Sequence, residues 1–65
     1  MNAKQVFKML MDDGWVHVRT NGSHWVFRKN GKSVVVPFHG NHDLAIGTLR
    51  NILRKAELTQ EEKHD

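Results

Sequence analysis

Histidine is the side chain in this sequence best suited to acid–base chemistry, because its ordinary pKa of about 6.5 lies close to neutral pH. The chain has five histidines and no cysteine. His24 follows Asn21-Gly22, a dipeptide typical of the type I′ hairpin turn. With Asn21 and Gly22 as the two turn residues, Arg19 lies directly opposite His24, with Cβ atoms about 4.5–5.5 Å apart. Both side chains would then reach one phosphate group.

An arginine and a histidine beside one phosphate match what RNA cleavage needs. RNA carries its own nucleophile in the 2′-hydroxyl, so the protein has only to move protons and stabilise charge. His24 is the candidate catalytic residue, and Arg19 offers paired donors to the phosphate oxygens. We expect no metal or other cofactor, and DNA, which lacks the 2′-hydroxyl, should not be cleaved. The competing interpretation of His24 is an exposed strand histidine with no chemical role.

Further candidate residues surround this pair. The second proton transfer is open among water, His17 and Ser23, because one histidine acts as either base or acid. The candidate accessory histidines are His17 and His39. The candidate RNA- and phosphate-binding residues are Arg19, Gly22, Ser23, Arg28, Lys29 and Lys32.

A metal site is the rival use of the histidines. His39, His42 and Asp43 place three potential ligands in one short segment. Structural zinc in small domains usually recruits thiolates, which this chain lacks, and a flexible loop holds a catalytic metal poorly. We therefore expect this segment to be a simple connection between a strand and a helix.

The segments that would position these residues change their periodicity along the chain. Apolar residues fall at helical spacing over 3–12, where Asn2 can cap the helix and Gly14 can end it. Three segments rich in Val, Trp and Phe follow, and Asn21-Gly22 and Asn30-Gly31 between them predict a three-stranded antiparallel meander. A second helical pattern covers 47–56. Its apolar positions are Ile46, Leu49, Ile52, Leu53 and Ala56.

The two tight turns predict which side chains share a face of the sheet. The face expected to receive the helices carries Val16, Val18, Trp25, Phe27, Val34 and Val36. The other face, expected to stay open, carries His17, Arg19, His24, Val26, Arg28 and Ser33. The pattern predicts an α+β domain, α-β-β-β-α, with both helices on one face of the sheet and the shape of a double-stranded-RNA-binding domain.

Length and charge fit a small domain that meets a polyanion. We expect one domain at 1–58 and a polar, disordered tail at 59–65. Residues 1–55 hold nine Lys and Arg against three Asp, whereas the last ten residues hold one Lys against four acids. Such a basic body favours RNA or an acidic protein as partner. The lack of cysteine and of any signal-peptide or membrane-spanning pattern indicates a cytoplasmic protein.

An ordered set of short motifs resembles the HicA toxins of toxin–antitoxin pairs. Between Lys4 and Leu58 these motifs are Gly14-Trp15, Arg19, Gly22-Ser23-His24, Val36-Pro37, His39-Gly40-Asn41 and Gly47-Thr48-Leu49-Arg50-Asn51-Ile52-Leu53. The resemblance implies an mRNA interferase of double-stranded-RNA-binding-like fold, in which the histidine of Gly-Ser-His, here His24, is catalytic. It also implies a HicB antitoxin, with the toxin monomeric when free and hetero-oligomeric when inhibited. Phe38 stands where related chains often carry a basic residue or a histidine.

Two other functions fit the same fold, a non-catalytic binder of double-stranded RNA and a regulatory partner of an acidic protein. A duplex binder should carry Lys and Arg at the start of its second helix. Here that start is Ile46-Gly47-Thr48, which counts against the binder. A HicB-like reading frame beside the gene for this chain would separate the classes.

Overall fold

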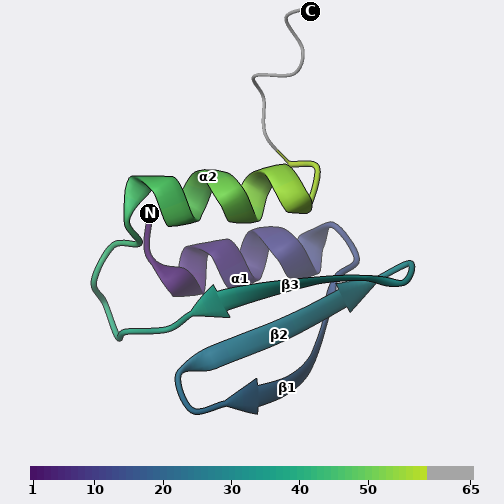
Figure 1. Cartoon of the computed structure of the whole chain (residues 1–65), viewed down its shortest axis with the longest axis horizontal. Coiled ribbons are helices and arrows are strands. Elements are labelled where there is room, and N and C mark those ends of the chain that lie inside the picture. The colour runs from purple at the N-terminus through teal and green to yellow at the C-terminus, as the bar shows by residue number, and fades with distance from the viewer. Residues whose placement is uncertain (59–65) are drawn as a thin grey trace, which may run out of the picture.

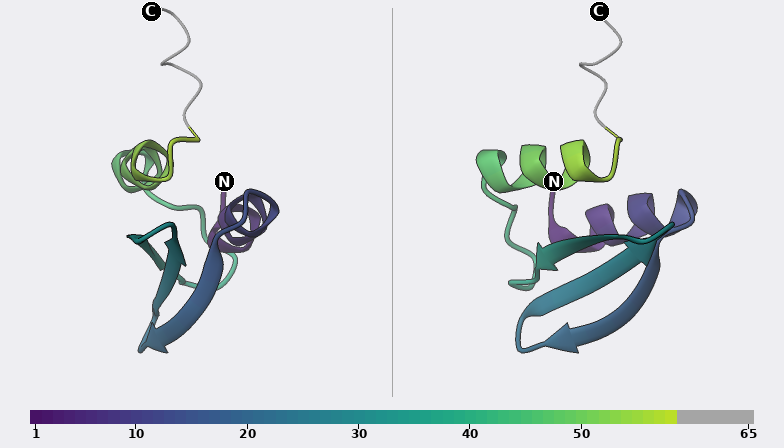
Figure 2. Two further views of the ribbon diagram at one scale, coloured as in Figure 1. Left: turned by 90° about the vertical axis from the view of Figure 1, so that its right-hand side faces the viewer. Right: turned by 45° about the vertical axis from the view of Figure 1, so that its right-hand side comes forward.

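The chain folds in the order helix, three strands, helix. The structure, a computed structural model, describes residues 1–58, and the tail predicted at 59–65 lies outside them. The sheet is antiparallel with strand order β1-β2-β3, and both helices lie on one side of it (Figure 1, Figure 2). The predicted α+β, double-stranded-RNA-binding-like architecture is confirmed. Its elements are α1 (Ala3–Asp12), β1 (Val16–Asn21), β2 (His24–Lys29), β3 (Lys32–Pro37) and α2 (Ile46–Lys55).

Helix α1 begins with a capping box. The Asn2 side chain accepts a hydrogen bond from the Gln5 backbone N–H at 3.0 Å, and the Gln5 side chain accepts one from the Asn2 N–H at 2.8 Å. These bonds satisfy N–H groups that have no partner inside the helix. The helix ends at Asp12, and two residues later Gly14 has a φ of +96°, the left-handed conformation that favours glycine. Trp15 then donates its backbone N–H to Leu10 at 2.9 Å, which turns the chain towards β1.

The hairpin between β2 and β3 has the predicted turn. Asn30 and Gly31 take φ values of +52° and +82°, as a type I′ turn requires, and Lys29 pairs with Lys32. The register therefore places Phe27 opposite Val34, on the face that receives the helices.

The hairpin between β1 and β2 differs from the prediction. Asn21 is the last residue of β1 and pairs with His24, so the turn residues are Gly22 and Ser23. Gly22 has a φ of +59°, whereas Asn21 does not have a positive φ. An Asn-Gly pair allows this alternative because the glycine alone supplies the positive φ when it stands first in the turn.

A β-bulge in β1 adds a second departure. The register shifts between His17 and Arg19, which leaves Val18 as the extra residue. The predicted placement of Val16 and Val18 in the core is wrong, since they are 59% and 44% exposed. His17, predicted on the open face, instead pairs with Phe27 and stacks on Trp25 with a centroid distance of 4.2 Å.

The core lies between the sheet and the two helices. Phe27, at the centre of β2, is fully buried, and the Phe7 ring of α1 stacks on Trp25 at 4.3 Å. Helix α2 contributes Ile52 and, just after its end, Ala56. Ile46, predicted on the apolar face of α2, is 64% exposed; it is the first residue of the helix, and the buried position, Ile52, lies more than one turn further on. The buried residues of this core are Ala3, Val6, Phe7, Leu10, Trp15, Phe27, Val34, Val36, Ile52 and Ala56. Val26 is also buried, but the register places it on the other face of the sheet.

Candidate active site

One face of the sheet is left uncovered, because both helices pack on the other (Figure 2). We call it the open face. The observed register gives it Val16, Arg19 and Asn21 from β1, His24, Val26 and Arg28 from β2, and Ser33, Val35 and Pro37 from β3. Two cationic side chains, one histidine and several valines thus share one surface.

His24 is the first residue of β2 and lies directly after the Gly22-Ser23 turn. Its strand neighbours on the open face are Asn21 and Pro37, neither of which carries charge. The side chain is exposed, and within residues 1–58 it makes no hydrogen bond and no ion pair. Neither packing nor pairing within this part of the chain engages the imidazole, so it is available to a ligand.

Arg19 lies on the open face as predicted but does not lie opposite His24. It pairs with Val26, and the residue opposite His24 is Asn21. The predicted direct pair is wrong because it depended on an Asn21-Gly22 turn. Arg19 and His24 are diagonal neighbours, about 7–8 Å apart, which a long side chain can span. The same phosphate therefore remains within reach of both.

The turn beside His24 is open on its outer side. A Cβ atom on Gly22 would meet nothing within 4 Å. Ser23 accepts the Phe38 N–H through its carbonyl at 2.7 Å, which continues the pairing of β2 with β3 past Pro37. This bond also brings His39, the next residue, to the end of the sheet where His24 lies. Of the two predicted accessory histidines, His39 is the one on this side of the molecule.

His17 cannot act beside His24 in this arrangement. Its ring stacks on Trp25 on the helical side of the sheet, and its Nε2 lies 2.8 Å from the Thr20 hydroxyl. The β-bulge at Val18, which the sequence pattern does not reveal, accounts for its placement.

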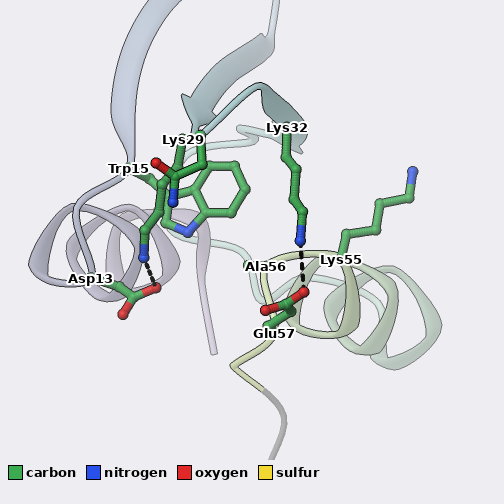
Figure 3. Close-up of a pocket in the computed structure, with 8 residues that line it drawn as sticks. Asp13, Trp15, Lys29, Lys32, Lys55, Ala56 and Glu57 are labelled. Carbon is green, nitrogen blue, oxygen red and sulfur yellow. Dashed lines mark hydrogen bonds and ion pairs between the residues drawn. The ribbon is translucent and has the colours of Figure 1, made fainter.

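Lys29 and Lys32 lie at the opposite end of the sheet from His24. Lys29 pairs with Asp13 at 2.9 Å and Lys32 with Glu57 at 2.7 Å (Figure 3). Between these pairs is a pocket of about 240 Å³, with Trp15 at its wall. The two ion pairs join the β2–β3 hairpin to the ends of both helices. The structure therefore does not bring these two lysines together with the rest of the predicted phosphate site.

The Lys32–Glu57 pair gives stability a pH dependence. Lys32 lowers the pKa of Glu57 below its ordinary value of 4.5, through the hydrogen bond first and its charge second. A carboxyl whose pKa is lowered by folding contributes stability above its ordinary pKa and loses it as the pH falls through the folded value. We expect Glu57→Gln to melt below the wild type at pH 7 and together with it at about pH 3. Thermal melts at both pH values test this, and an equal difference at both would contradict it.

The segment 39–43 is a connection. His42 donates its backbone N–H to the His39 carbonyl at 3.3 Å, and Asp43 pairs with the N-terminal amino group at 3.4 Å. Among residues 1–58, no three side chains of His, Cys, Asp or Glu gather in a group that could hold a metal ion.

The residues that the sequence pattern missed are Asn21 and three exposed valines, two on the open face and one at the bulge. Asn21 lies opposite His24, and Val16, Val18 and Val35 are each between 44% and 59% exposed. The outward position of Val35 could have been predicted, because Val35 lies between the core positions Val34 and Val36 and side chains alternate along a strand. Nothing in the sequence pattern places Val16 and Val18 outside the core.

The α-β-β-β-α sandwich with one uncovered, partly basic sheet face defines the class as a double-stranded-RNA-binding-like domain. The model of the HicA toxins of bacterial toxin–antitoxin systems matches residues 3–58. The chain therefore belongs to the HicA toxin family and is a toxin of a toxin–antitoxin system. The search of curated proteins returned no match. None of the helices in residues 1–58 is long and apolar enough to cross a membrane.

Proposed function

We propose that this toxin is a ribonuclease that cleaves mRNA without a metal ion and that His24 is its catalytic residue. The observation that carries the proposal is the position of His24, exposed and unpaired within residues 1–58, on the open face of a HicA-family domain. A histidine that neither packs nor pairs in the fold has no structural task there. Its side chain is suited to proton transfer near neutral pH.

The reaction is an internal displacement at phosphorus. The 2′-oxygen attacks the adjacent phosphorus, so that an O2′–P bond forms while the P–O5′ bond breaks. The 2′-hydroxyl loses a proton and the departing 5′-oxygen gains one. His24 carries one of these transfers, and water, Ser23 or His39 is available for the other. The products are a 2′,3′-cyclic phosphate and a 5′-hydroxyl.

Arg19 stabilises the charge that develops on the phosphate. Its guanidinium donates to the non-bridging oxygens, where negative charge increases in the transition state. Arg28 lies four residues beyond His24 on the same strand face, about 13 Å away, and holds a more distant phosphate. Gly22 leaves the space through which the backbone of the RNA approaches. Lys29 and Lys32 are not part of this proposal, since both are paired with carboxylates at the other end of the sheet.

Cleavage in the presence of a chelator tests the mechanism. We expect the purified toxin to cleave single-stranded RNA in excess EDTA, to leave DNA of the same sequence intact and to release cyclic phosphate ends, because the nucleophile belongs to the RNA. Product ends are identified by mass spectrometry.

Two results would contradict this mechanism. Activity that EDTA abolishes and zinc restores would point to His39, His42 and Asp43 instead. Binding of RNA without any cleavage would favour a non-catalytic RNA-binding domain.

We further propose that a HicB-type antitoxin inhibits the toxin by covering the open face, in the cytoplasm where mRNA is the substrate. The toxin is then a monomer when free and hetero-oligomeric when inhibited. Arg19 and Arg28 favour acidic side chains on the partner, and the exposed Val16 and Val35 favour apolar ones. A partner seated there would block RNA from His24.

A further inference from the structure

Strand β3 forms an uncovered edge of the sheet. It pairs with β2 only, and hydrogen-bonded positions alternate along an antiparallel pair. The bond from the Phe38 N–H to the Ser23 carbonyl fixes this alternation, so Val34 and Val36 bond to β2. The backbone N–H and C=O groups of Ser33 and Val35 consequently point outward. Within residues 1–58 no other backbone group bonds to them.

A groove runs beside this edge. Its volume is about 200 Å³, and it lies between β3 and one stripe of α2. Val34 and Ile52, which are 2% and 4% exposed, form its apolar base. The α2 residues that line it are Thr48, Asn51, Ile52 and Lys55, which follow helical spacing and so share one side of the helix.

We propose that an extended, acidic segment of the antitoxin adds to β3 as a fourth strand, with alternate side chains in this groove. Free backbone groups give an added strand its affinity, and a groove beside them receives every second side chain. This inference rests on the proposed antitoxin partner and identifies the strand of the toxin to which the antitoxin binds. A segment bonded to Val35 lies at the border of the open face and can continue over it towards His24.

The charges beside the groove favour an acidic segment over a second copy of this chain. Lys55 lines the groove and makes no ion pair within residues 1–58, whereas Lys32, at the start of the edge, is already paired with Glu57. Within those residues, a second copy of this chain would add another unpaired Lys55 to the same surface and no acidic partner for the first, so charge does not favour it. An acidic segment is attracted instead. Pro37 has no N–H to donate, so the added pairing is confined to the Ser33–Val35 stretch.

Amide hydrogen exchange of the toxin alone and with a HicB-type antitoxin that inhibits it tests the proposal. In the free toxin the Ser33 and Val35 amides should exchange fast and those of Val34 and Val36 slowly, because only the latter bond to β2. In the complex, exchange at Ser33 and Val35 should slow by about tenfold or more. A complex that leaves both rates unchanged overturns the proposal. So does protection in the free toxin that rises with its concentration, which would indicate self-pairing.

A substitution at Val35 tests the proposed backbone hydrogen bond to the antitoxin. Val35→Pro removes an N–H that the fold does not use, so binding of the antitoxin should weaken by about tenfold, whereas Val35→Ala keeps the N–H and should weaken it much less. Equal affinities of the two variants would overturn the proposal. The cleavage rate of each free variant is measured alongside. If the Ser33 and Val35 amides are protected in the complex but the free toxin has no ribonuclease activity, only the proposed function is refuted. If the antitoxin inhibits the toxin but these amides still exchange fast, only the added strand is refuted.

Discussion

Replacing Phe27 with alanine is expected to remove most of the folding stability of the protein. Phe27 is fully buried, and its ring lies against those of Phe7 and His17 at 5.4 and 5.5 Å. Truncation of a buried phenylalanine costs about 3–5 kcal/mol. A domain of this size has a total stability of similar magnitude, about 5 kcal/mol. Circular dichroism should show that Phe27→Ala melts more than about 10 °C below the wild type.

Val16→Ala is the matched control on the neighbouring strand. Val16 is 59% exposed on the open face, so its truncation should change the free energy of unfolding by only about 0.5 kcal/mol. If Phe27→Ala melted within a few degrees of the wild type, or if Val16→Ala unfolded the domain, the observed placement of β1 and β2 would be wrong.

Replacing His24 with alanine is expected to abolish growth arrest without unfolding the protein. The side chain is exposed and makes no contact on which the described fold depends, so stability should change by about 0.5 kcal/mol or less. Affinity for RNA should fall only modestly because Arg19 and Arg28 remain to attract phosphate. Cells that express His24→Ala should therefore grow, although they contain folded toxin. Growth curves, with soluble protein quantified and melted, measure both effects.

His42→Ala is the control for loss of an exposed histidine. His42 lies in the connection between β3 and α2, and it is exposed. We expect this variant to arrest growth as the wild type does. A harmless His42→Ala toxin would instead favour a metal site in that connection.

The two hairpins show how far turn chemistry predicts register. Asn30-Gly31 occupies its turn as the type I′ preference predicts, and the register of β2 with β3 follows. Asn21-Gly22 offers the same signal, yet Asn21 ends a strand and Gly22 starts the turn. Both turns place the glycine where a positive φ is needed. The choice between the two turns therefore depends on packing across the whole sheet. The bulge at Val18 likewise leaves no local signal, so the placement of Val16 and His17 could not be predicted.

The candidate site was predictable where it depends on alternation within β2. His24, Val26 and Arg28 share one face of that strand because residues two apart do so in any strand. The positions of Lys29 and Lys32 were not predictable in the same way. Their partners Asp13 and Glu57 are 16 and 25 residues away, and only the docking of both helix ends brings them into contact.

The rate of RNA cleavage by His24→Ala in excess EDTA is the most direct test of the proposed catalytic role. Wild-type and variant toxin are compared at equal concentrations of folded protein, with RNA bound to saturation so that differences in affinity do not contribute. Loss of a positioned acid or base should lower the single-turnover rate by about 10²- to 10⁴-fold, while the wild type remains active in EDTA. A folded His24→Ala toxin that cleaves RNA at nearly the wild-type rate would contradict the account.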